Sequence, residues 1–249
     1  MAAGKPKPVA LDDTAAASLT SSNLESTHVT AVYNRIAAHF SQTRYKAWPV
    51  IEQFLKDQPS GSVGADIGCG NGKYLGVNPQ LTMIASDQST GLIGICKQRG
   101  FPYLAVADNL ALPFLDEVFD FAISIAVIHH MSTTERRQRA VGEILRCLKR
   151  DGGRLLIFVW ALEQSATAKR EFSADKQDYL VPWKIPGQPA VKENGETNEE
   201  NVHYRFYHMF KDGELDQLVK DAGTAANLPI KIIERGYDRD NWFVIVERC

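Results

Sequence analysis

A short glycine-rich segment constrains the fold of this chain more than any other part of it. Residues 63–74 read V-G-A-D-I-G-C-G-N-G-K-Y, an apolar run that ends in an acidic residue and passes into three closely spaced glycines. Gly68, Gly70 and Gly72 lack a Cβ, so the backbone can turn sharply there and approach a ligand closely. A loop of this kind at the carboxyl end of a first strand is where an open α/β sheet binds a nucleotide-like cofactor.

Strand and helix patterns alternate after this segment, which predicts an α/β fold with a doubly wound, mostly parallel sheet. Helices are predicted at 25–40 and 48–56, ahead of the sheet, and the second begins near Pro49. The predicted strands lie at 63–67, 82–86, 103–107, 119–125 and 154–160, with helices at about 90–99 and 133–149. A helix at 212–222 and a closing antiparallel hairpin of strands at 230–234 and 242–247 complete the predicted fold.

The 249 residues fit one large α/β domain. Residues 1–27 are rich in Ala, Ser and Thr, with two early prolines, and are predicted to form a flexible N-terminal tail. The remaining residues, 28–249, are predicted to form a single domain. Within it the alternation breaks at about 163–202, which holds several prolines and an acidic run, so we expect an insertion that lies over the sheet and is partly mobile.

Composition excludes several classes of protein. The net charge of −2 gives no global basic field, although local basic clusters can still serve a structured RNA. The four cysteines form no C-x-x-C pair, so we expect no metal site and no disulfide framework, but reduced thiols in a cytoplasmic protein, with the nucleus as an alternative. No apolar run approaches the length of a membrane span, and the N-terminus lacks the apolar stretch of a secretory signal.

The glycine pattern D-x-G-x-G-x-G favours S-adenosylmethionine over a dinucleotide, because it lacks G-x-G-x-x-G and no clean helix follows to hold a pyrophosphate. Asp66, beside the glycines, suits the α-ammonium group of that cofactor, directly or through water. Asp87 ends the second strand, the usual place for a carboxylate that accepts from ribose hydroxyls. Asp108 ends the third strand and can accept from the adenine amino group, with Asn109 and Leu110 lining the base.

Five sequence blocks occur in order over residues 63–159, namely D-I-G-C-G-N-G, S-D-Q-S, A-D-N-L-x-L-P-F, F-D-F-A-I-S and L-K-R-D-G-G-R-L. Together they resemble class I S-adenosylmethionine-dependent methyltransferases, which implies that Rossmann-like fold. Two alternatives are a degenerate scaffold, in which the acidic residues only cap turns and helices, and a dehydrogenase. The predicted cofactor-binding residues are Asp66, Gly68, Cys69, Gly70, Gly72, Asp87, Gln88, Asp108, Asn109 and Leu110.

Four further segments are more specific than the cofactor motifs. They are V-Y-N-R-I-A-x-H-F-S-Q-T-R-Y-K-A-W-P, V-W-A-L-E-Q, H-Y-R-F-Y-H-M-F and G-Y-D-R-D-N-W-F-V-I-V. They resemble the eukaryotic, yeast-type family that methylates the carboxylate of 5-carboxymethyluridine at the tRNA wobble position, and the resemblance covers residues 29–246 except the insertion. The chain departs from the family pattern in two places. Ala47 stands where we expect a proline, and the insertion is short and less basic than we expect. These differences affect how strongly the insertion binds RNA and leave the expected chemistry unchanged.

The resemblance implies transfer of a methyl group from a sulfonium to a carboxylate oxygen, giving a methyl ester at the anticodon loop of tRNA. A carboxylate is ionised at neutral pH and needs no general base, so the site must hold an anion in line with the methyl group. The candidates for this work are as follows. Arg44 and Arg205 can hold the carboxylate, Tyr33, His129 and Tyr204 can donate hydrogen bonds, and Trp160 or Trp242 can stack on the flipped uracil.

Each of these residues also has a purely structural interpretation. Arg44 can be a surface ion-pair partner, Tyr33 can contact the cofactor instead, and one of His129 and His130 can be a core histidine. Trp160 and especially Trp242 can be core residues. The cations at 136–150 can form a solvated helix face or touch tRNA phosphates.

The third strand is apolar, lies at a predicted sheet edge and carries no lysine or proline that would block strand addition. The resemblance implies a small zinc-binding activator subunit, and we expect this partner to cover residues 101–107 in a heterodimer. The zinc belongs to that partner. Two other functions stay open: a small-molecule carboxyl or quinone methyltransferase, and a catalytically idle member that binds the activator.

Overall fold

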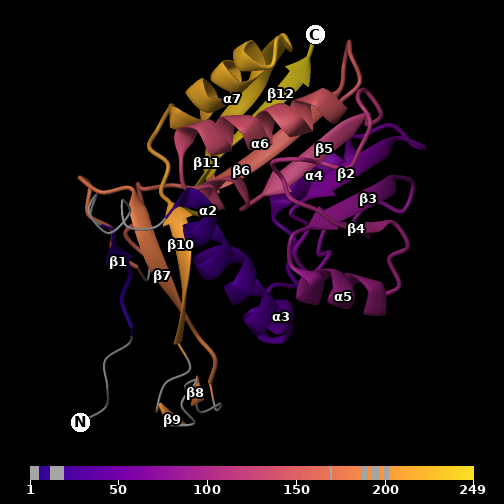
Figure 1. Ribbon diagram of the computed structural model, residues 1–249. Coiled ribbons are helices and arrows are strands. Elements are labelled where there is room, and N and C mark those ends of the chain that lie inside the picture. The colour runs from indigo at the N-terminus through magenta and orange to yellow at the C-terminus, as the bar shows by residue number, and fades with distance from the viewer. Residues whose placement is uncertain (1–5, 12–19, 169, 187–189, 192–196, 199–201) are drawn as a thin grey trace.

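The protein is described by a computed structural model that covers residues 6–11, 20–168, 170–186, 190–191, 197–198 and 202–249. A seven-stranded sheet forms the centre, with the strand order β11-β12-β6-β5-β2-β3-β4 (Figure 1). The strands β4, β3, β2, β5 and β6 are parallel, while β12 runs antiparallel to both of its neighbours. The predicted doubly wound, mostly parallel fold with an antiparallel C-terminal strand is therefore confirmed.

The core strands form where the apolar runs predict them. They are β2 (Val63–Ile67), β3 (Thr82–Asp87), β4 (Leu104–Val106), β5 (Phe121–Ile125) and β6 (Arg154–Trp160). The short strand β4 lies at the predicted edge of the sheet. Between the strands run helix α5 (Thr90–Gln98), which Ser89 caps through its hydroxyl, and helix α6 (Thr134–Cys147), which Thr133 caps in the same way.

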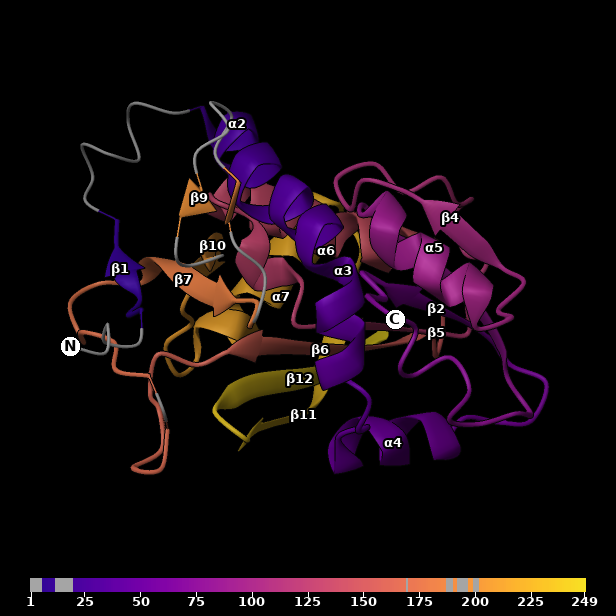
Figure 2. The same ribbon diagram turned by 90° about the horizontal axis from the view of Figure 1, so that it is seen from below.

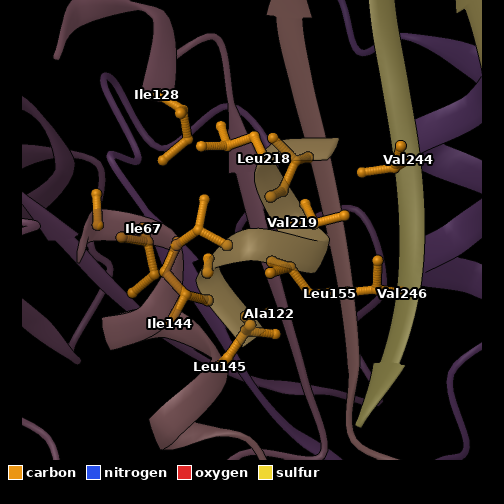
Figure 3. Close-up of a cluster of buried hydrophobic side chains, with 14 of the residues drawn as sticks. Ile67, Ala122, Ile128, Ile144, Leu145, Leu155, Leu218, Val219, Val244 and Val246 are labelled. Carbon is orange, nitrogen blue, oxygen red and sulfur yellow. The ribbon is translucent and has the colours of Figure 1, made fainter. Parts of the chain in front are cut away.

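Helices cover both faces of the sheet because side chains of successive strand residues point to opposite faces. On β5, Ala122 faces α6 and α7 (Glu214–Ala225), whereas Phe121 and Ile123 face α4 (Pro49–Lys56) and α5. Figure 3 shows the first of these two cores, where Ile144 and Leu145 of α6 meet Val219 of α7 over the sheet. Both cores consist mainly of apolar side chains, and their packing fixes the central strands and the loops at their ends.

A long helical segment precedes the sheet. It comprises α2 (Ser21–Glu25), a π-helical turn η1 (Ser26–Thr30) and α3 (Ala31–Thr43), and it lies between the small sheet described next and α5 (Figures 1 and 2). The prediction of a flexible tail over 1–27 is wrong for part of that range. Thr20 accepts from the Asn23 amide as an N-cap, and Leu24 and Glu25 are buried, so burial orders this turn.

A second, antiparallel sheet stands beside the main one, with the strand order β1-β7-β10. Its strands are β1 (Val9–Ala10), β7 (Asp178–Lys184) and β10 (Val202–His208). The predicted insertion at 163–202 thus contributes β7, an ordered central strand, because Tyr179 and Val181 pack against Tyr207 and Met209. The strands β8 (Ala190–Val191) and β9 (Thr197–Asn198) form a short ladder, and most of the predicted acidic run at 192–200 lies outside the described residues.

The C-terminal hairpin is longer than predicted. Strands β11 (Ile230–Asp238) and β12 (Asn241–Arg248) meet in a two-residue turn at Arg239 and Asp240. Both turn residues have positive φ, 51° and 62°, as the tight turns favoured in hairpins require. No helix in the described ranges combines the length and the apolar character that crossing a bilayer requires.

Candidate active site

A cavity of about 510 Å³ opens at the carboxyl edge of the parallel strands. Its wall combines the loops after β2, β3, β4, β5 and β6 with helix α3, strand β10 and the β11–β12 turn. Six cationic side chains and three carboxylates line the cavity. The cations are Arg44, Lys46, Lys73, Arg170, Arg205 and Arg239, and the carboxylates are Asp66, Asp87 and Asp240.

The glycine loop forms the floor of the cavity next to β2. Gly68, Gly70 and Gly72 adopt φ values of 81°, 56° and 71°, a region that side chains disfavour. At Gly68 a Cβ would lie 2.3 Å from Cγ2 of Val127, so only glycine fits there. The amides of Gly68 and Cys69 both donate to the Ser86 carbonyl, which ties the loop to the end of β3.

Asp66 and Asp87 supply the negative end of the cavity. Asp66 is buried, and its Oδ2 atom has no hydrogen-bond partner. Burial, with help from Asp87 and against Lys73, raises the pKa of Asp66 to about 7. Asp87 accepts from the Gly70 amide at 2.9 Å and from the Ser89 amide at 2.8 Å, and burial raises its pKa. An unpaired buried carboxylate oxygen fits an ammonium ligand, as S-adenosylmethionine offers.

The predicted cofactor residues divide into those on the wall and those behind it. Asp66, Gly68, Cys69, Gly70, Asp87, Gln88 and Asn109 line the cavity. Gly72, Asp108 and Leu110 are not on the wall, and Asp108 instead accepts from the Leu110 amide through Oδ1 at 2.9 Å. The positions of these residues match a cofactor that spans the ends of β2, β3 and β4, and their roles stay predictions.

Arg205 marks the opposite, cationic end of the cavity. Its side chain is 2 % exposed, and its Nε and Nη2 atoms have no hydrogen-bond partner, while Nη1 donates to the Tyr33 hydroxyl at 3.3 Å. The guanidinium lies over the rings of Trp183 and Tyr207, at 4.8 and 5.0 Å from their centroids. The pair Nε and Nη2 forms one edge of the guanidinium, the edge that can bind both oxygens of a carboxylate.

Tyr33 and His130 hold this guanidinium through one chain of hydrogen bonds. Nδ1 of His130 lies 2.7 Å from the Phe206 carbonyl, which can only accept, so the proton of the ring sits on Nδ1. Nε2 then accepts from the Tyr33 hydroxyl at 2.9 Å, and the Tyr33 oxygen accepts from Arg205. Burial lowers the pKa of His130 to about 3, so the ring stays neutral at physiological pH.

His129, the histidine predicted to act in the site, does not line the cavity. It is fully buried, and its Nδ1 accepts from the Trp160 backbone amide at 3.0 Å. Burial, and then the charges of neighbouring groups, lowers its pKa well below the ordinary value. His129 therefore fits the alternative of a core histidine, while its neighbour His130 reaches the cavity.

Arg44 and Arg170 face the same region as Arg205. The guanidinium of Arg44 lies 5.1 Å from the Trp183 ring centroid, and that of Arg170 lies 5.2 Å from the Trp160 centroid. Burial is the main cause that lowers the pKa of Arg170, and Arg205 and Arg44 add to the effect. No ion pair within the described ranges joins any of the three to a carboxylate. Three like charges that no described carboxylate neutralises attract an anion.

Of the candidates Trp160, Trp242 and Tyr204, one lines the cavity and two do not. Trp160 lines the cavity, and its indole stacks on Tyr207 with ring centroids 4.3 Å apart. Trp242 packs against the core and donates to Glu163 at 3.0 Å, outside the cavity wall. Tyr204 is also absent from the wall, because β10 turns the alternate residues Arg205 and Tyr207 toward it.

Several wall residues were not among the predicted site residues. Arg170, Lys73, His130 and Tyr207 line the cavity without having been assigned a role from the sequence. The H-Y-R-F-Y-H-M-F segment contains a signal for Tyr207, since Tyr207 stands two residues from the candidate Arg205. Arg170 lies in the predicted insertion, where no local pattern indicates which side chain turns inward.

Comparisons with known proteins agree with this geometry. The sequence profile described as "Methyltransferase domain" matches residues 65–157. The chain is 49 % identical to a tRNA (carboxymethyluridine(34)-5-O)-methyltransferase of Schizosaccharomyces pombe, over 90 % of this chain and 97 % of that protein. It is 40 % identical to the protein of the same name from Saccharomyces cerevisiae, over 90 % and 96 %. A solved S-adenosylmethionine-dependent methyltransferase from Clostridium acetobutylicum shares the fold, with a TM-score of 0.60, 13 % identity and coverage of 87 % and 98 %.

Proposed function

This chain belongs to the tRNA (carboxymethyluridine(34)-5-O)-methyltransferases, and from this premise we propose that Arg205 holds the carboxylate of the wobble uridine during methyl transfer. The enzyme uses S-adenosylmethionine to convert 5-carboxymethyluridine in tRNA to its methyl ester. The observation that carries the residue-level proposal is the free Nε–Nη2 edge of a fully enclosed guanidinium. Such an edge needs an anion with two oxygens, and the substrate offers one.

The chain's residues have a limited chemical task. S-adenosylmethionine supplies an electrophilic methyl group, and a carboxylate is already ionised at neutral pH, so no residue has to remove a proton from the substrate. Arg205 orients the carboxylate through one edge, and Arg44 and Arg170 add positive charge nearby. One carboxylate oxygen would gain the methyl group as the bond between that carbon and the sulfonium sulfur breaks, which would give a neutral ester and S-adenosylhomocysteine as the leaving group. Because the ester has lost its charge, Arg205 binds it more weakly, which favours product release.

Tyr33 and His130 act on the substrate only through Arg205. The Tyr33 hydroxyl donates its proton to His130 and accepts from Nη1 of Arg205, while Nε and Nη2 stay without a partner. Trp160 presents part of its indole to the cavity, with one face stacked on Tyr207. We assign to Trp160 a contact with the uracil ring through the edge of its indole. The nearby Arg170 can contact the same uracil ring.

We further propose that tRNA approaches over the loop between α3 and α4. Arg44 and Lys46 line the cavity there, and Tyr45 between them is 78 % exposed. An exposed aromatic ring flanked by two cations suits an unstacked base and its phosphates. The cations at 136–150 are a poor alternative, because Arg136, Arg146 and Lys149 are already paired with carboxylates.

The partner proposal concerns the edge strand β4. Tyr103 and Val106 are 55 % and 54 % exposed on this edge, and no described strand pairs with its outer side. We propose that the small zinc-binding activator subunit adds a strand there and forms a heterodimer with this chain. The four thiols are free, which supports our proposal that the enzyme works in the reducing cytoplasm, with the nucleus as the alternative.

One assay tests the proposed function. The chain, alone and with the activator, is incubated with methyl-labelled S-adenosylmethionine and total tRNA from cells that cannot form the ester. We expect label in tRNA that mild alkali releases, as a methyl ester requires. Arg205→Ala should abolish transfer while cofactor affinity is kept. Label only in small molecules would support a small-molecule methyltransferase instead, and normal transfer by the variant would remove Arg205 from its role.

A further inference from the structure

We propose that the free edge of Arg205 makes the cavity select a carboxylate and reject the corresponding carboxamide on the same uridine. This inference rests on the proposed function and adds to it the substrate that the enzyme must refuse. A 5-carbamoylmethyl group has the same shape as a 5-carboxymethyl group, with NH₂ in place of one oxygen. Steric exclusion therefore cannot separate the two groups, and hydrogen bonding and charge have to do so.

The guanidinium edge provides two donors in a fixed plane. Nε and Nη2 of Arg205 are buried and each carries a hydrogen without a hydrogen-bond partner, on a residue that lines the cavity. A carboxylate accepts both with its two oxygens. A carboxamide accepts only one, and its NH₂ group meets the other N–H, so a buried donor stays unsatisfied on each side.

The surroundings of Arg205 do not correct this mismatch. The groups that act on Arg205 are the hydroxyls of Tyr33 and Tyr207, and no carboxylate is among them. The Tyr33 oxygen already accepts from Nη1, and its proton goes to His130. Because that proton is used, the contact of 3.4 Å between the two tyrosine hydroxyls has Tyr207 as its donor. The other nearby cations, Arg44 and Arg170, can only donate.

The hydrogen-bond chain also fixes which edge is free. If His130 lost the Phe206 contact, its tautomer could change and Tyr33 could turn its proton toward the cavity. With the present arrangement, Nη1 is bound to the Tyr33 oxygen, which leaves Nε and Nη2 as the unpaired donors. His130 and Tyr33 are positioning residues for this selection, since they reach the substrate only through Arg205.

The experiment compares three anticodon stem-loop RNAs that differ only at the wobble base: carboxymethyluridine, carbamoylmethyluridine and unmodified uridine. Dissociation constants are measured with the enzyme loaded with S-adenosylhomocysteine, together with the activator. We expect the carboxymethyl loop to bind at least about tenfold more tightly than the carbamoylmethyl loop, since buried donors are left unpaired. The carbamoylmethyl loop should bind no better than unmodified uridine.

Two matched variants locate the effect. Arg205→Gln replaces the donor edge by an amide with one donor and one acceptor, so the preference for the carboxylate should fall to about threefold or less. Arg44→Gln removes the same charge from the same cavity, but Arg44 is exposed and water can satisfy its donors, so the variant should weaken both modified loops and keep most of the preference. Thermal unfolding and S-adenosylhomocysteine affinity show whether each variant is folded.

Equal binding of the carboxymethyl and carbamoylmethyl loops by the wild type would overturn the inference, and this comparison needs no variant. So would an unchanged preference in folded Arg205→Gln. Methyl transfer to the carboxymethyl loop, measured in parallel, separates this failure from failure of the proposed function. Transfer with equal binding contradicts only the selection, whereas no transfer to any loop contradicts the function.

Discussion

Arg205 and Tyr207 are two residues apart on β10, so the alternation of a strand turns both side chains toward the cavity. The 3₁₀ turn after β5 separates His129 from His130, sending one into the core and the other to the wall. The sequence predicts the location of both histidines, but a short turn has no strand periodicity from which to tell them apart. The acidic residues at the strand ends were predictable, because parallel strands all present their carboxyl ends at one edge.

Asp66 gives a prediction about pH. Its pKa of about 7 lies above the ordinary 3.8, so in the free protein the group binds a proton below pH 7 and weakens the fold above it. An ammonium ligand needs the carboxylate. Affinity for S-adenosylhomocysteine should therefore rise about five- to tenfold between pH 6 and 7.5, with release of a proton. Calorimetry in two buffers of different ionisation heat measures both quantities.

Asp66→Asn is the matched control, because it keeps the shape and removes the titration. The variant should bind more weakly, with an affinity that barely changes over the same pH interval. A slope that survives in this variant would assign the titration to another group, of which Asp87 is the nearest with a raised pKa.

At the scale of elements, apolar periodicity predicted the five parallel strands and the helices between them because these elements bury a continuous apolar face. β7 was missed because its run D-Y-L-V-P-W-K contains a proline and pairs with β10, about twenty residues away. The hairpin was predicted too short, since the outer strand β11 is mostly exposed and shows no apolar run over residues 233–238. Local patterns do not encode such long-range or exposed pairing.

The loop between α3 and α4 gives a prediction about RNA. Tyr45→Ala should raise KM for tRNA about tenfold with little change in kcat, since base–aromatic stacking contributes about 1–3 kcal/mol. Tyr45→Trp keeps an aromatic face and should retain the KM of the wild type. Initial rates over a range of tRNA concentrations measure both. An unchanged KM in the alanine variant would show that RNA approaches elsewhere.

Strand β4 gives a prediction about the partner. The Tyr103 carbonyl and the Ala107 amide bond to β3, so Leu104 and Val106 present their polar backbone atoms outward. Val106→Pro should therefore remove an outward N–H and abolish co-purification with the activator, while the bonds to β3 remain. Val106→Thr keeps the N–H and should still bind. Co-purification of the proline variant at the wild-type yield would place the partner on another surface.

At the scale of the whole molecule, the small sheet must stay attached to the main fold for Arg205 to keep its place. His208 at the end of β10 makes that attachment, with Nδ1 at 2.6 Å from Asp178 of β7 and Nε2 at 2.7 Å from Glu214 of α7. Gln177 also donates to Glu214, and Arg137 lies close enough to repel the charged ring. Burial alone would lower the pKa of His208, but the two carboxylates outweigh it and raise the pKa.

This attachment predicts how stability depends on pH. Since the pKa of folded His208 is raised, its stabilising contribution is complete below the unfolded value of about 6.5 and disappears as pH rises through the folded value. The free energy of unfolding should therefore decrease from pH 6.5 to 8.5 more in the wild type than in His208→Gln. Urea unfolding at the two pH values measures it, and equal decreases in both proteins would exclude His208 as the cause.

The two ends of the cavity have different structural origins. The end that faces the cofactor is formed by loops of the central sheet, a framework shared with solved methyltransferases, while Tyr33 and Arg205 come from an N-terminal helix and the three-stranded sheet. Such a division makes the acceptor module exchangeable. The helix and the three-stranded sheet could be grafted onto a relative that acts on other molecules. Such a graft is a route to transferring the specificity of this enzyme for anionic nucleosides while the methyl-donor pocket stays unchanged.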